Sequence, residues 1–351
     1  MPRKIRTLVV DDSALMRMLI PSMLKRSPHI EVVGAASNPF AAREMIKDLN
    51  PDVITLDVEM PKMDGISFLN KIMTLRPTPV VMVSSLTQKV ADITLKALEL
   101  GAIDFIGKPT LDLEKNMPLL ADELIDKVRA AAVSNVRAHS RKVEVKAAPP
   151  VQFDTTEAIV AMGASTGGVE TLGRVLGALP PNAPGIVIAQ HMPAAFTKQF
   201  AERIDKSCAV NVSEAEQGRR IRPGSVFIAP GDRHLEVRRS GADYVCQLTD
   251  EAPVSGHKPS VDVLFNSVAK ACGAQAVGVI LTGMGKDGAD GLKRMRDAGC
   301  HTLGQDEASS LVYGMPKAAF EAGAVERQLP EDKIPSAILR IVSESGDVLR
   351  I

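Results

Sequence analysis

The sequence predicts an α/β protein made of two domains, each built on a doubly wound parallel sheet. The chain has 351 residues, and a chain of this length suggests two domains at roughly 100–200 residues each. In two regions, short runs rich in β-branched residues alternate with helical patterns, which is typical of a parallel sheet covered on both faces. A segment without such a pattern separates the two regions.

The first region contains the first of these alternating patterns. Each apolar run is followed by an amphipathic stretch, so strand and helix are expected to alternate. The segments in order are TLVVDD, ALMRMLIPSMLKR, HIEVVGAAS, PFAAREMIKDL, PDVITLDV, GISFLNKIMTL, PVVMVSS, ADITLKALEL and AIDFIGKP.

The segment between the two regions is predicted to be an exposed linker. From about Ala130 the sequence loses its apolar periodicity, and it gains Pro149-Pro150 and a cluster of Arg and Lys. Such a composition favours irregular structure. We therefore expect a first domain over 1–129, a linker over 130–157 and a second domain over 158–351.

In the second region the alternation resumes, with one interruption. HLEVRR and DYVCQLTD, joined through residues 239–242, predict a local antiparallel hairpin inside the α/β domain. The other segments are AIVAMGAS, GGVETLGRVLGAL, GIVIAQHM, FTKQFAERIDK, SVFIAPGD, VDVLFNSVAKAC, AVGVILTGMG, GADGLKRMRDAG and HTLGQD.

Composition and charge exclude several classes of protein. The 42 basic and 42 acidic residues balance, so no net field attracts nucleic acid or an anionic membrane. No run approaches the ~18 apolar residues of a membrane span, and the first apolar run ends too early for a secretory signal. The cysteines are isolated, which favours free thiols over disulfides or zinc ligands. We expect a cytoplasmic protein that neither binds nucleic acid nor inserts into a membrane.

Polar residues follow the apolar runs of the first region. Asp11 and Asp12 follow TLVV, Asp57 follows VITL, Ser84 follows VVMV and Lys108 follows DFIG. In open α/β sheets, ligands bind outside the carboxyl ends of the strands. Alone, each residue is better explained as a helix cap or a solvated surface group. Together, the carboxylates predict a Mg²⁺ site, and the amine and hydroxyl beside them favour acceptance of a phosphoryl group.

These motifs resemble the receiver domain of response regulators, over residues 5 to about 128. The residues that carry the resemblance are VVDDS, ITLDVEMPKMDG, VVMVSS and the lysine of GKP. The resemblance implies a flavodoxin-like fold, phosphorylation of Asp57 by a histidine kinase, and Mg²⁺ held by Asp11, Asp12 and Asp57. It also implies that Ser84 and Lys108 contact the phosphoryl group and that Phe105 is a switch aromatic.

In the second region, Gly163–Gly167 matches Gly-x-Ser-x-Gly around Ser165. In this pattern a sharp strand-to-helix turn exposes the serine oxygen at the positive end of a helix. The alternative is that Ser165 or Thr166 only caps the helix. A dinucleotide-binding loop fails because Ser165 replaces its second glycine, and LTGMGKDG lacks the residues of a Walker phosphate loop. A nucleophilic serine fits the residues best.

Such a serine needs a base and a group that orients the base. His191 ends the predicted strand GIVIAQ, His234 competes with it, and His257 lies in the loop GHKPS. For His301 we expect a surface or structural role. Asp287 follows a third strand in a glycine-rich turn, where it could orient the base or cap the next helix. The order Ser…His…Asp differs from the Ser…Asp…His order of α/β-hydrolases, so an ordinary lipase or esterase fold fits poorly unless His301 is the base.

Residues ~158–348 resemble the catalytic domain of chemotaxis protein-glutamate methylesterases. The motifs are GASTGG, IAQHM, FIAPGDRHL, GHKPSVDVLF and LTGMGKDG, and the whole chain matches the receiver-linker-esterase plan of that family. The resemblance implies a Rossmann-like domain in which Ser165 is the nucleophile, His191 the base, Asp287 its orienting acid and the Met284 N–H the oxyanion donor. It further implies phosphorylation-activated hydrolysis of glutamyl methyl esters on methyl-accepting chemoreceptors, glutamine deamidation in some members, and no cofactor at the esterase site.

Two functions from other classes remain as alternatives. A receiver joined to a DNA-binding output would be a transcription factor, but the second region shows no helix-turn-helix pattern and the chain is neutral. A non-enzymatic interaction module would use Ser165 only as a helix cap.

Overall fold

In the computed structural model, the described residues are 3–61, 63–85, 87–108, 113–134 and 158–348. The chain divides into two compact units, Met1–Arg141 and Lys142–Ile351.

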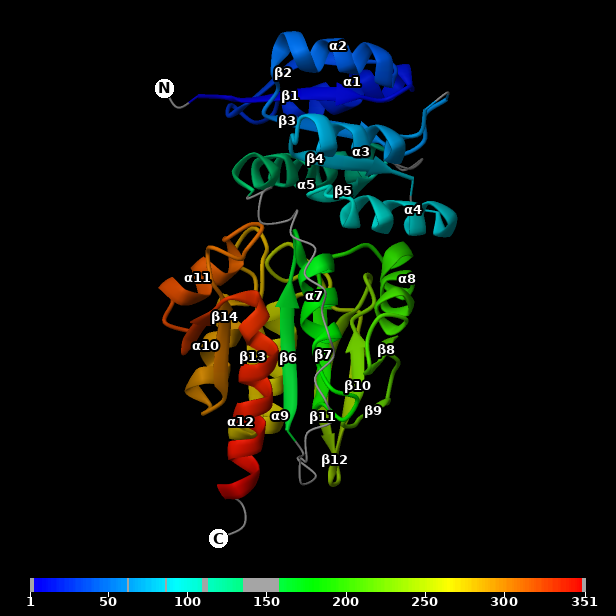
Figure 1. The fold of residues 1–351 in the computed structure, drawn as a ribbon. Coiled ribbons are helices and arrows are strands. Elements are labelled where there is room, and N and C mark those ends of the chain that lie inside the picture. Colours follow the sequence, from blue (N-terminus) through cyan, green and yellow to red (C-terminus); the bar gives the residue numbers. More distant parts are fainter. Residues whose placement is uncertain (1–2, 62, 86, 109–112, 135–157, 349–351) are drawn as a thin grey trace. The chain divides into compact units, whose positions relative to one another are not determined.

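The first unit has a five-stranded parallel sheet in the order β2-β1-β3-β4-β5 (Figure 1). This order is flavodoxin-like. Its elements are β1 (Ile5–Val10), α1 (Ala14–Leu24), β2 (Ile30–Ala36), α2 (Pro39–Leu49), β3 (Val53–Asp57), α3 (Gly65–Leu75), β4 (Val80–Ser84), α4 (Gln88–Glu99), β5 (Asp104–Gly107) and α5 (Leu113–Val133).

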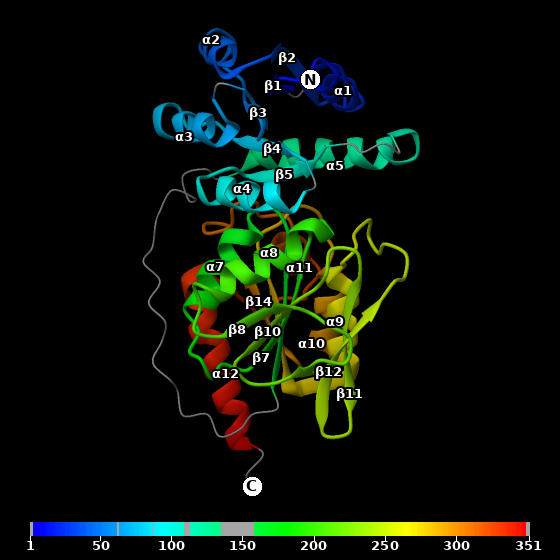
Figure 2. The same cartoon turned by 90° about the vertical axis from the view of Figure 1, so that its right-hand side faces the viewer.

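Local sequence explains where these helices begin. Ser13, Asn38 and Asp64 each accept a backbone N–H of the first turn of α1, α2 and α3, which is the usual N-cap arrangement. Helices α1 and α5 cover one face of the sheet, and α2, α3 and α4 cover the other (Figure 2). The central strands β3 and β4 are buried along their whole length, so a residue at their carboxyl ends reaches solvent only at the sheet edge.

The second unit has a seven-stranded parallel sheet in the order β15-β14-β13-β6-β7-β10-β8. From the central strand β6 the chain moves to β7 on one side and later to β13 on the other. The strands are β6 (Ile159–Ala164), β7 (Gly185–Gln190), β8 (Asn211–Glu214), β10 (Ser225–Ile228), β13 (Ala276–Ile280), β14 (His301–Gln305) and β15 (Arg327–Leu329). Adjacent parallel strands with opposite connections form a topological switch point, where α/β proteins bind ligands.

Helices cover both faces of this sheet. On one face lie α7 (Gly168–Gly177), α8 (Ala194–Asp205) and α12 (Ile334–Val348), and on the other lie α9 (Val261–Cys272) and α10 (Ala289–Asp297) (Figures 1 and 2). The remaining helix is α11 (Met315–Glu321), and short 3₁₀ turns span Gly273–Gln275 and Glu331–Lys333. The predicted hairpin, β11 (His234–Ser240) with β12 (Asp243–Thr249), packs on α9.

The structure confirms the predicted fold class and adds detail that the sequence did not indicate. A two-residue strand, β9 (Arg220–Ile221), pairs with β12 and makes the hairpin a three-stranded antiparallel sheet. Helix α5 continues to Val133, so its last four residues, 130–133, lie in the predicted linker. Residues 135–157 of that linker lie outside the described residues. The four cysteines are free, as predicted. Among the described residues, no helix combines the length and the apolar composition of a membrane span.

Candidate functional sites

The carboxyl ends of β1, β3 and β5 bring an acidic cluster and a lysine together. Asp11 and Asp57 are fully buried, while Asp12 is exposed. Lys108 Nζ lies 2.8 Å from Asp57 Oδ1 and 3.6 Å from Asp11 Oδ2. The cluster predicted from the sequence therefore forms around the side chain of Asp57.

Burial controls the charge of this cluster. It raises the pKa of Asp57 to about 6, against the opposing hydrogen bond from Lys108, and it raises the pKa of Asp11. For Lys108, burial alone would lower the pKa, but the hydrogen bond and charge of Asp57 outweigh burial and raise it. One ammonium group thus faces more carboxylates than it can neutralise.

The cluster fits a divalent cation. Asp11, Asp12 and Asp57 each offer an oxygen within 4.8 Å of the others. Asp11 Oδ2 and Asp57 Oδ2 are buried and have no hydrogen-bond partner. Buried carboxylate oxygens without a donor are costly, and Mg²⁺ prefers oxygen ligands of this kind.

The predicted switch residues have other partners in this structure. Ser84 Oγ lies 2.8 Å from Thr94 Oγ1 of α4, in a buried contact. The ring of Phe105 is buried, and Lys127 of α5 lies 5.3 Å from its centroid and donates a hydrogen bond to the Phe105 carbonyl. Of the residues predicted to surround the phosphoryl group, Lys108 contacts Asp57, whereas the Ser84 hydroxyl is hydrogen-bonded to Thr94 of α4.

Ser165 directly follows β6 at the switch point of the second sheet. Its side chain is partly exposed. The N-cap of α7 is Gly167, in the left-handed region at φ 80°, and it makes no side-chain cap hydrogen bond. A Cβ added to Gly283 would lie 2.8 Å from Ser165 Cβ, so the chain after β13 packs directly against the serine. The capping role considered for Ser165 is not observed at this N-cap.

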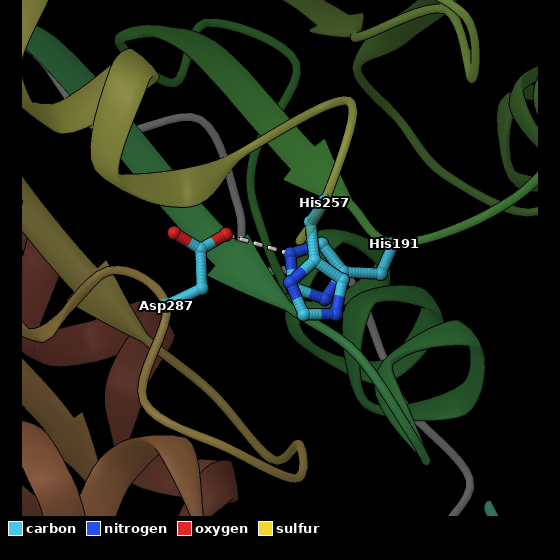
Figure 3. A group of neighbouring side chains, drawn as sticks. All are labelled: His191, His257 and Asp287. Carbon is cyan, nitrogen blue, oxygen red and sulfur yellow. Dashed lines mark hydrogen bonds and ion pairs between the residues drawn. The ribbon is translucent and has the colours of Figure 1, made fainter. Parts of the chain in front are cut away.

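His191 and Asp287 form a buried pair beside this turn. His191 follows β7, Asp287 precedes α10, and His191 Nε2 lies 2.8 Å from Asp287 Oδ2 (Figure 3). The exposed fraction of the side chain is 8% for His191 and 1% for Asp287. Gln190 Nε2 donates to the carbonyl oxygens of Ser165 and His191 at 3.0 and 3.2 Å, which ties the ends of β6 and β7 together.

Asp287 is held at the N-terminus of α9. Its carboxylate accepts hydrogen bonds from Ser260 Oγ at 2.8 Å, Val261 N at 2.7 Å and Asp262 N at 3.1 Å. Burial alone would raise the pKa of Asp287, but the hydrogen bond and charge of His191 and these backbone donors lower it to about 2. Asp287 therefore stays ionised, and it caps α9 rather than the helix α10 considered in the sequence analysis.

The pairing with Asp287 selects one tautomer of His191. A carboxylate only accepts hydrogen bonds, so the imidazole proton belongs on Nε2. Nδ1 then carries a lone pair, and it is buried without a hydrogen-bond partner. Among the described residues, no hydrogen bond joins the Ser165 hydroxyl to His191, and Nδ1 is the ring atom available to accept one. Catalytic hydrogen bonds often tighten only when substrate binds.

The Met284 N–H, the predicted oxyanion donor, is available for a ligand. Met284 follows Gly283, the residue that packs against Ser165. Within the described part of the chain, the backbone N–H of Met284 makes no hydrogen bond, whereas that of Gly283 donates to Val312 O at 3.1 Å. An N–H next in the chain to the residue that packs on Ser165 suits a developing oxyanion.

The other histidines of this unit have different surroundings. His234 is fully buried, with Nε2 donating to Ala252 O and Nδ1 accepting from Ser260 N, both at 3.1 Å. It is a structural residue and not a competing base. His301 pairs with Glu326 at 3.0 Å near the surface, as expected. His257 stacks on His191, with 3.8 Å between ring centroids, a contact that the sequence did not predict.

His191, His257 and Asp287 also offer nitrogen and oxygen atoms within 4.8 Å of one another. The two imidazole planes are 8° apart and overlap (Figure 3). Imidazole lone pairs lie in the ring plane, so those of two stacked rings run parallel and do not converge on one ion. The observed arrangement is therefore not a preformed metal centre.

Several contacts in these sites could not be found by motif alone. The partners of Asp287 at Ser260 and Val261 follow the loop GHKPS, and a serine before an apolar helical run is the usual sign of an N-cap. That sign predicts the start of α9, but not that a carboxylate from another loop occupies it. The contacts of Ser84 with Thr94 and of His257 with His191 have no local sequence pattern.

Comparison with known proteins adds an independent observation. Residues 160–338 match the family model described as CheB methylesterase, and residues 7–116 match that of the response regulator receiver domain. A protein of Chromohalobacter salexigens named protein-glutamate methylesterase/protein-glutamine glutaminase is 50% identical over 99% of this chain and 99% of its own. A protein of Dechloromonas aromatica with the same name, numbered 1, is 52% identical over 98% of this chain and 100% of its own. The crystal structure of the Thermotoga maritima CheB methylesterase catalytic domain is 38% identical and covers 53% of this chain and 98% of that one, with a TM-score of 0.52.

Proposed function

The chain belongs to the CheB methylesterase family, and we propose that it is a phosphorylation-activated protein-glutamate methylesterase that also deamidates protein glutamine. Its substrates are methyl-accepting chemoreceptors, its phosphodonor is the histidine kinase of the chemotaxis pathway, and it acts in the cytoplasm. The family is one observation behind this proposal, and the receiver over residues 7–116 is a second.

The observation that most directly supports hydrolysis by a nucleophilic serine is the His191–Asp287 pair next to Ser165. A serine hydroxyl is a weak nucleophile at neutral pH and needs a base to take its proton. His191 Nδ1 has the free lone pair for this task, and the buried carboxylate of Asp287 fixes the tautomer and offsets the positive charge of the ring once it is protonated.

The reaction follows from these roles. His191 Nδ1 takes the Ser165 proton as Oγ attacks the ester carbonyl, and the oxyanion of the tetrahedral intermediate accepts the Met284 N–H. His191 then returns the proton to the leaving methoxide, which departs as methanol, and water hydrolyses the acyl-enzyme by the same steps. One such oxyanion donor contributes about 10²–10³ in rate. An amide nitrogen in place of the methoxy oxygen gives the same acyl-enzyme, which accounts for deamidation as a second activity.

The receiver controls this reaction through Asp57. Asp11, Asp12 and Asp57 would hold Mg²⁺, which when bound offsets the negative charge that gathers during phosphoryl transfer. Lys108 already contacts the acceptor carboxylate at 2.8 Å and offsets charge from the other side. A phosphoryl group adds about −2 charge and three strong acceptor oxygens. These oxygens compete with Thr94 for the Ser84 hydroxyl, and through α4 and Phe105 the change reaches the receiver surface.

Replacing the nucleophile tests the proposed function. Ser165→Ala should abolish methanol release from methylated chemoreceptor membranes and labelling by a serine-reactive fluorophosphonate, with an unchanged circular dichroism spectrum. The exposed Ser336 provides a matched control, because its hydroxyl bonds only the neighbouring Lys333 carbonyl among the described residues, and Ser336→Ala should behave as wild type. Near-native methanol release by Ser165→Ala would remove Ser165 from its role.

A further inference from the structure

A second histidine lies against the proposed general base, and the reaction described above does not use it. The ring of His257 stacks on that of His191 at 3.8 Å, with 8° between the ring planes (Figure 3). His191 comes from the end of β7, and His257 comes from the loop between β12 and α9. The contact joins two separate segments of the chain at the reacting residues.

The hydrogen bond of the His191 ring does not by itself fix the plane of the ring. Its one hydrogen bond among the described residues runs from Nε2 to Asp287, while Nδ1 is buried without a partner. The χ2 torsion of histidine has a broad energy minimum, so one hydrogen bond at the edge of the ring leaves its plane poorly fixed. The plane determines where the Nδ1 lone pair points. A parallel ring at van der Waals distance blocks rotation of His191 out of this plane.

The loop that carries His257 is itself held firmly. The buried ring of His234 bonds both of its ends, donating to Ala252 O and accepting from Ser260 N, each at 3.1 Å. Ser260 in turn donates to Asp287. The position of the loop is therefore set by the same residues that position the orienting carboxylate.

The tip of the loop fixes the orientation of His257. Val254 and His257 exchange two backbone hydrogen bonds of 2.9 and 3.1 Å across a two-residue turn. The two central residues, Ser255 and Gly256, have φ of 53° and 81°, as in a tight type I′ hairpin turn. The His257 ring is further fixed by a hydrogen bond from Nδ1 to Ser255 O at 2.9 Å. The turn thus presents an ordered aromatic face to His191.

We propose that His257 is a positioning residue for ester hydrolysis, which holds the plane of the His191 ring so that Nδ1 can accept the Ser165 proton. This inference rests on the proposed function, because it assigns His257 a role through His191. The face of the ring is what matters in this role, so an aromatic side chain without nitrogen should replace it.

Three substitutions in the full-length protein separate this role from others. His257→Ala removes the ring, His257→Leu keeps apolar bulk without a flat face, and His257→Phe keeps a flat ring. We expect Ala and Leu to lower kcat for methanol release about 10- to 100-fold, because small misplacements of catalytic groups cost rates of this size. KM should change less than about threefold, and Phe should stay within about fivefold of wild type, since it retains the stacking surface. In a His191→Ala background, His257→Ala should add less than about twofold, since the two residues act as a unit.

The same variants contradict the proposal if Phe is no more active than Leu, if the loss falls on KM, or if the loss persists undiminished without His191. The rate of Ser165 labelling by a fluorophosphonate should follow the same ranking as kcat. This second measurement does not need a methyl ester. Absence of methanol release from wild type would therefore count against the proposed substrate, while the labelling series would still decide the role of His257.

Discussion

His191 Nε2 lies 2.8 Å from Asp287 Oδ2, and the same carboxylate accepts the first backbone N–H groups of α9. His191 and the helix N-terminus together hold the carboxylate ionised, and the carboxylate commits the imidazole proton to Nε2. The arrangement leaves Nδ1 as the basic atom of the ring. In this way a helix start, one acid and one histidine define the direction in which the proposed base acts.

Asp287→Asn should reverse this arrangement. An amide nitrogen can donate to Nε2, which moves the imidazole proton to Nδ1, where it blocks acceptance of the serine proton. We expect kcat to fall by about 10³–10⁴, the size of effect seen when a triad acid is replaced in this way. The exposed Asp290, three residues on, provides the control Asp290→Asn. An Asp287→Asn enzyme within tenfold of wild type would contradict the assigned tautomer.

Asp287 should also shape stability in acid. Its pKa of about 2 lies below the ordinary value of 3.8, so its contribution is present above about pH 4 and is lost as pH falls towards 2. Asp262, whose pKa burial raises to about 6, titrates in the opposite sense and at higher pH. Between pH 4 and 2.5, urea unfolding should show wild type losing on the order of 1 kcal/mol more than Asp287→Asn. Equal losses in the two proteins would contradict the lowered pKa.

The receiver should respond to pH and Mg²⁺ together. With its pKa raised to about 6, Asp57 holds its proton more tightly in the folded receiver than in the unfolded chain. This difference stabilises the folded state fully below about pH 4, and the stabilisation is lost as pH rises through 6. Metal-free protein should therefore have a receiver that is less stable at pH 7.5 than at pH 5, by on the order of 1 kcal/mol or more. Calorimetry should show that Mg²⁺ raises the receiver unfolding temperature at pH 7.5 but little at pH 5. Asp57→Asn should show neither effect, and a Mg²⁺ response that is equal at the two pH values would contradict this account.

The bond between Ser84 and Thr94 should oppose activation. Because the two hydroxyls lie 2.8 Å apart, Ser84 must give up this bond to reach a phosphoryl group on Asp57. Thr94→Val removes this partner at similar volume and leaves the longer contact of Ser84 Oγ with Ser85 O at 3.2 Å. One neutral hydrogen bond is worth about 1 kcal/mol. The concentration of a small phosphodonor that half-activates methanol release should fall about two- to fivefold, on the same estimate. Thr94→Ser keeps the hydroxyl and should match wild type, and an unchanged or higher requirement in Thr94→Val would show that Thr94 does not restrain Ser84.

The residues at strand ends could be predicted from the sequence because each follows an apolar run. Asp57, Ser165 and His191 lie where parallel strands end, Asp287 lies in the loop after β13, and each sheet brings its own strand ends to one edge. Their spatial order follows from strand order, which the sequence pattern does not state. The short strand β9 escaped prediction because two residues show no alternation.

The contacts made by loops could not be predicted in this way. The loop that brings His257 to His191 is held by His234 and Ser260. The sequence around each of these residues shows no pattern that indicates this contact. Likewise, the tautomer of His191 depends on Asp287 meeting the start of α9. Such contacts join segments far apart in the sequence, so neither hydrophobic periodicity nor a short motif predicts them.

The most direct test of the account is methanol release from methylated chemoreceptor membranes by wild type, Asp57→Asn and Ser165→Ala, with and without Mg²⁺ and a small phosphodonor. The account predicts release by wild type that rises with phosphodonor and Mg²⁺, a basal rate in Asp57→Asn that does not rise, and no release in Ser165→Ala. Release that is equal in wild type and Ser165→Ala, or that rises equally in Asp57→Asn, would contradict it.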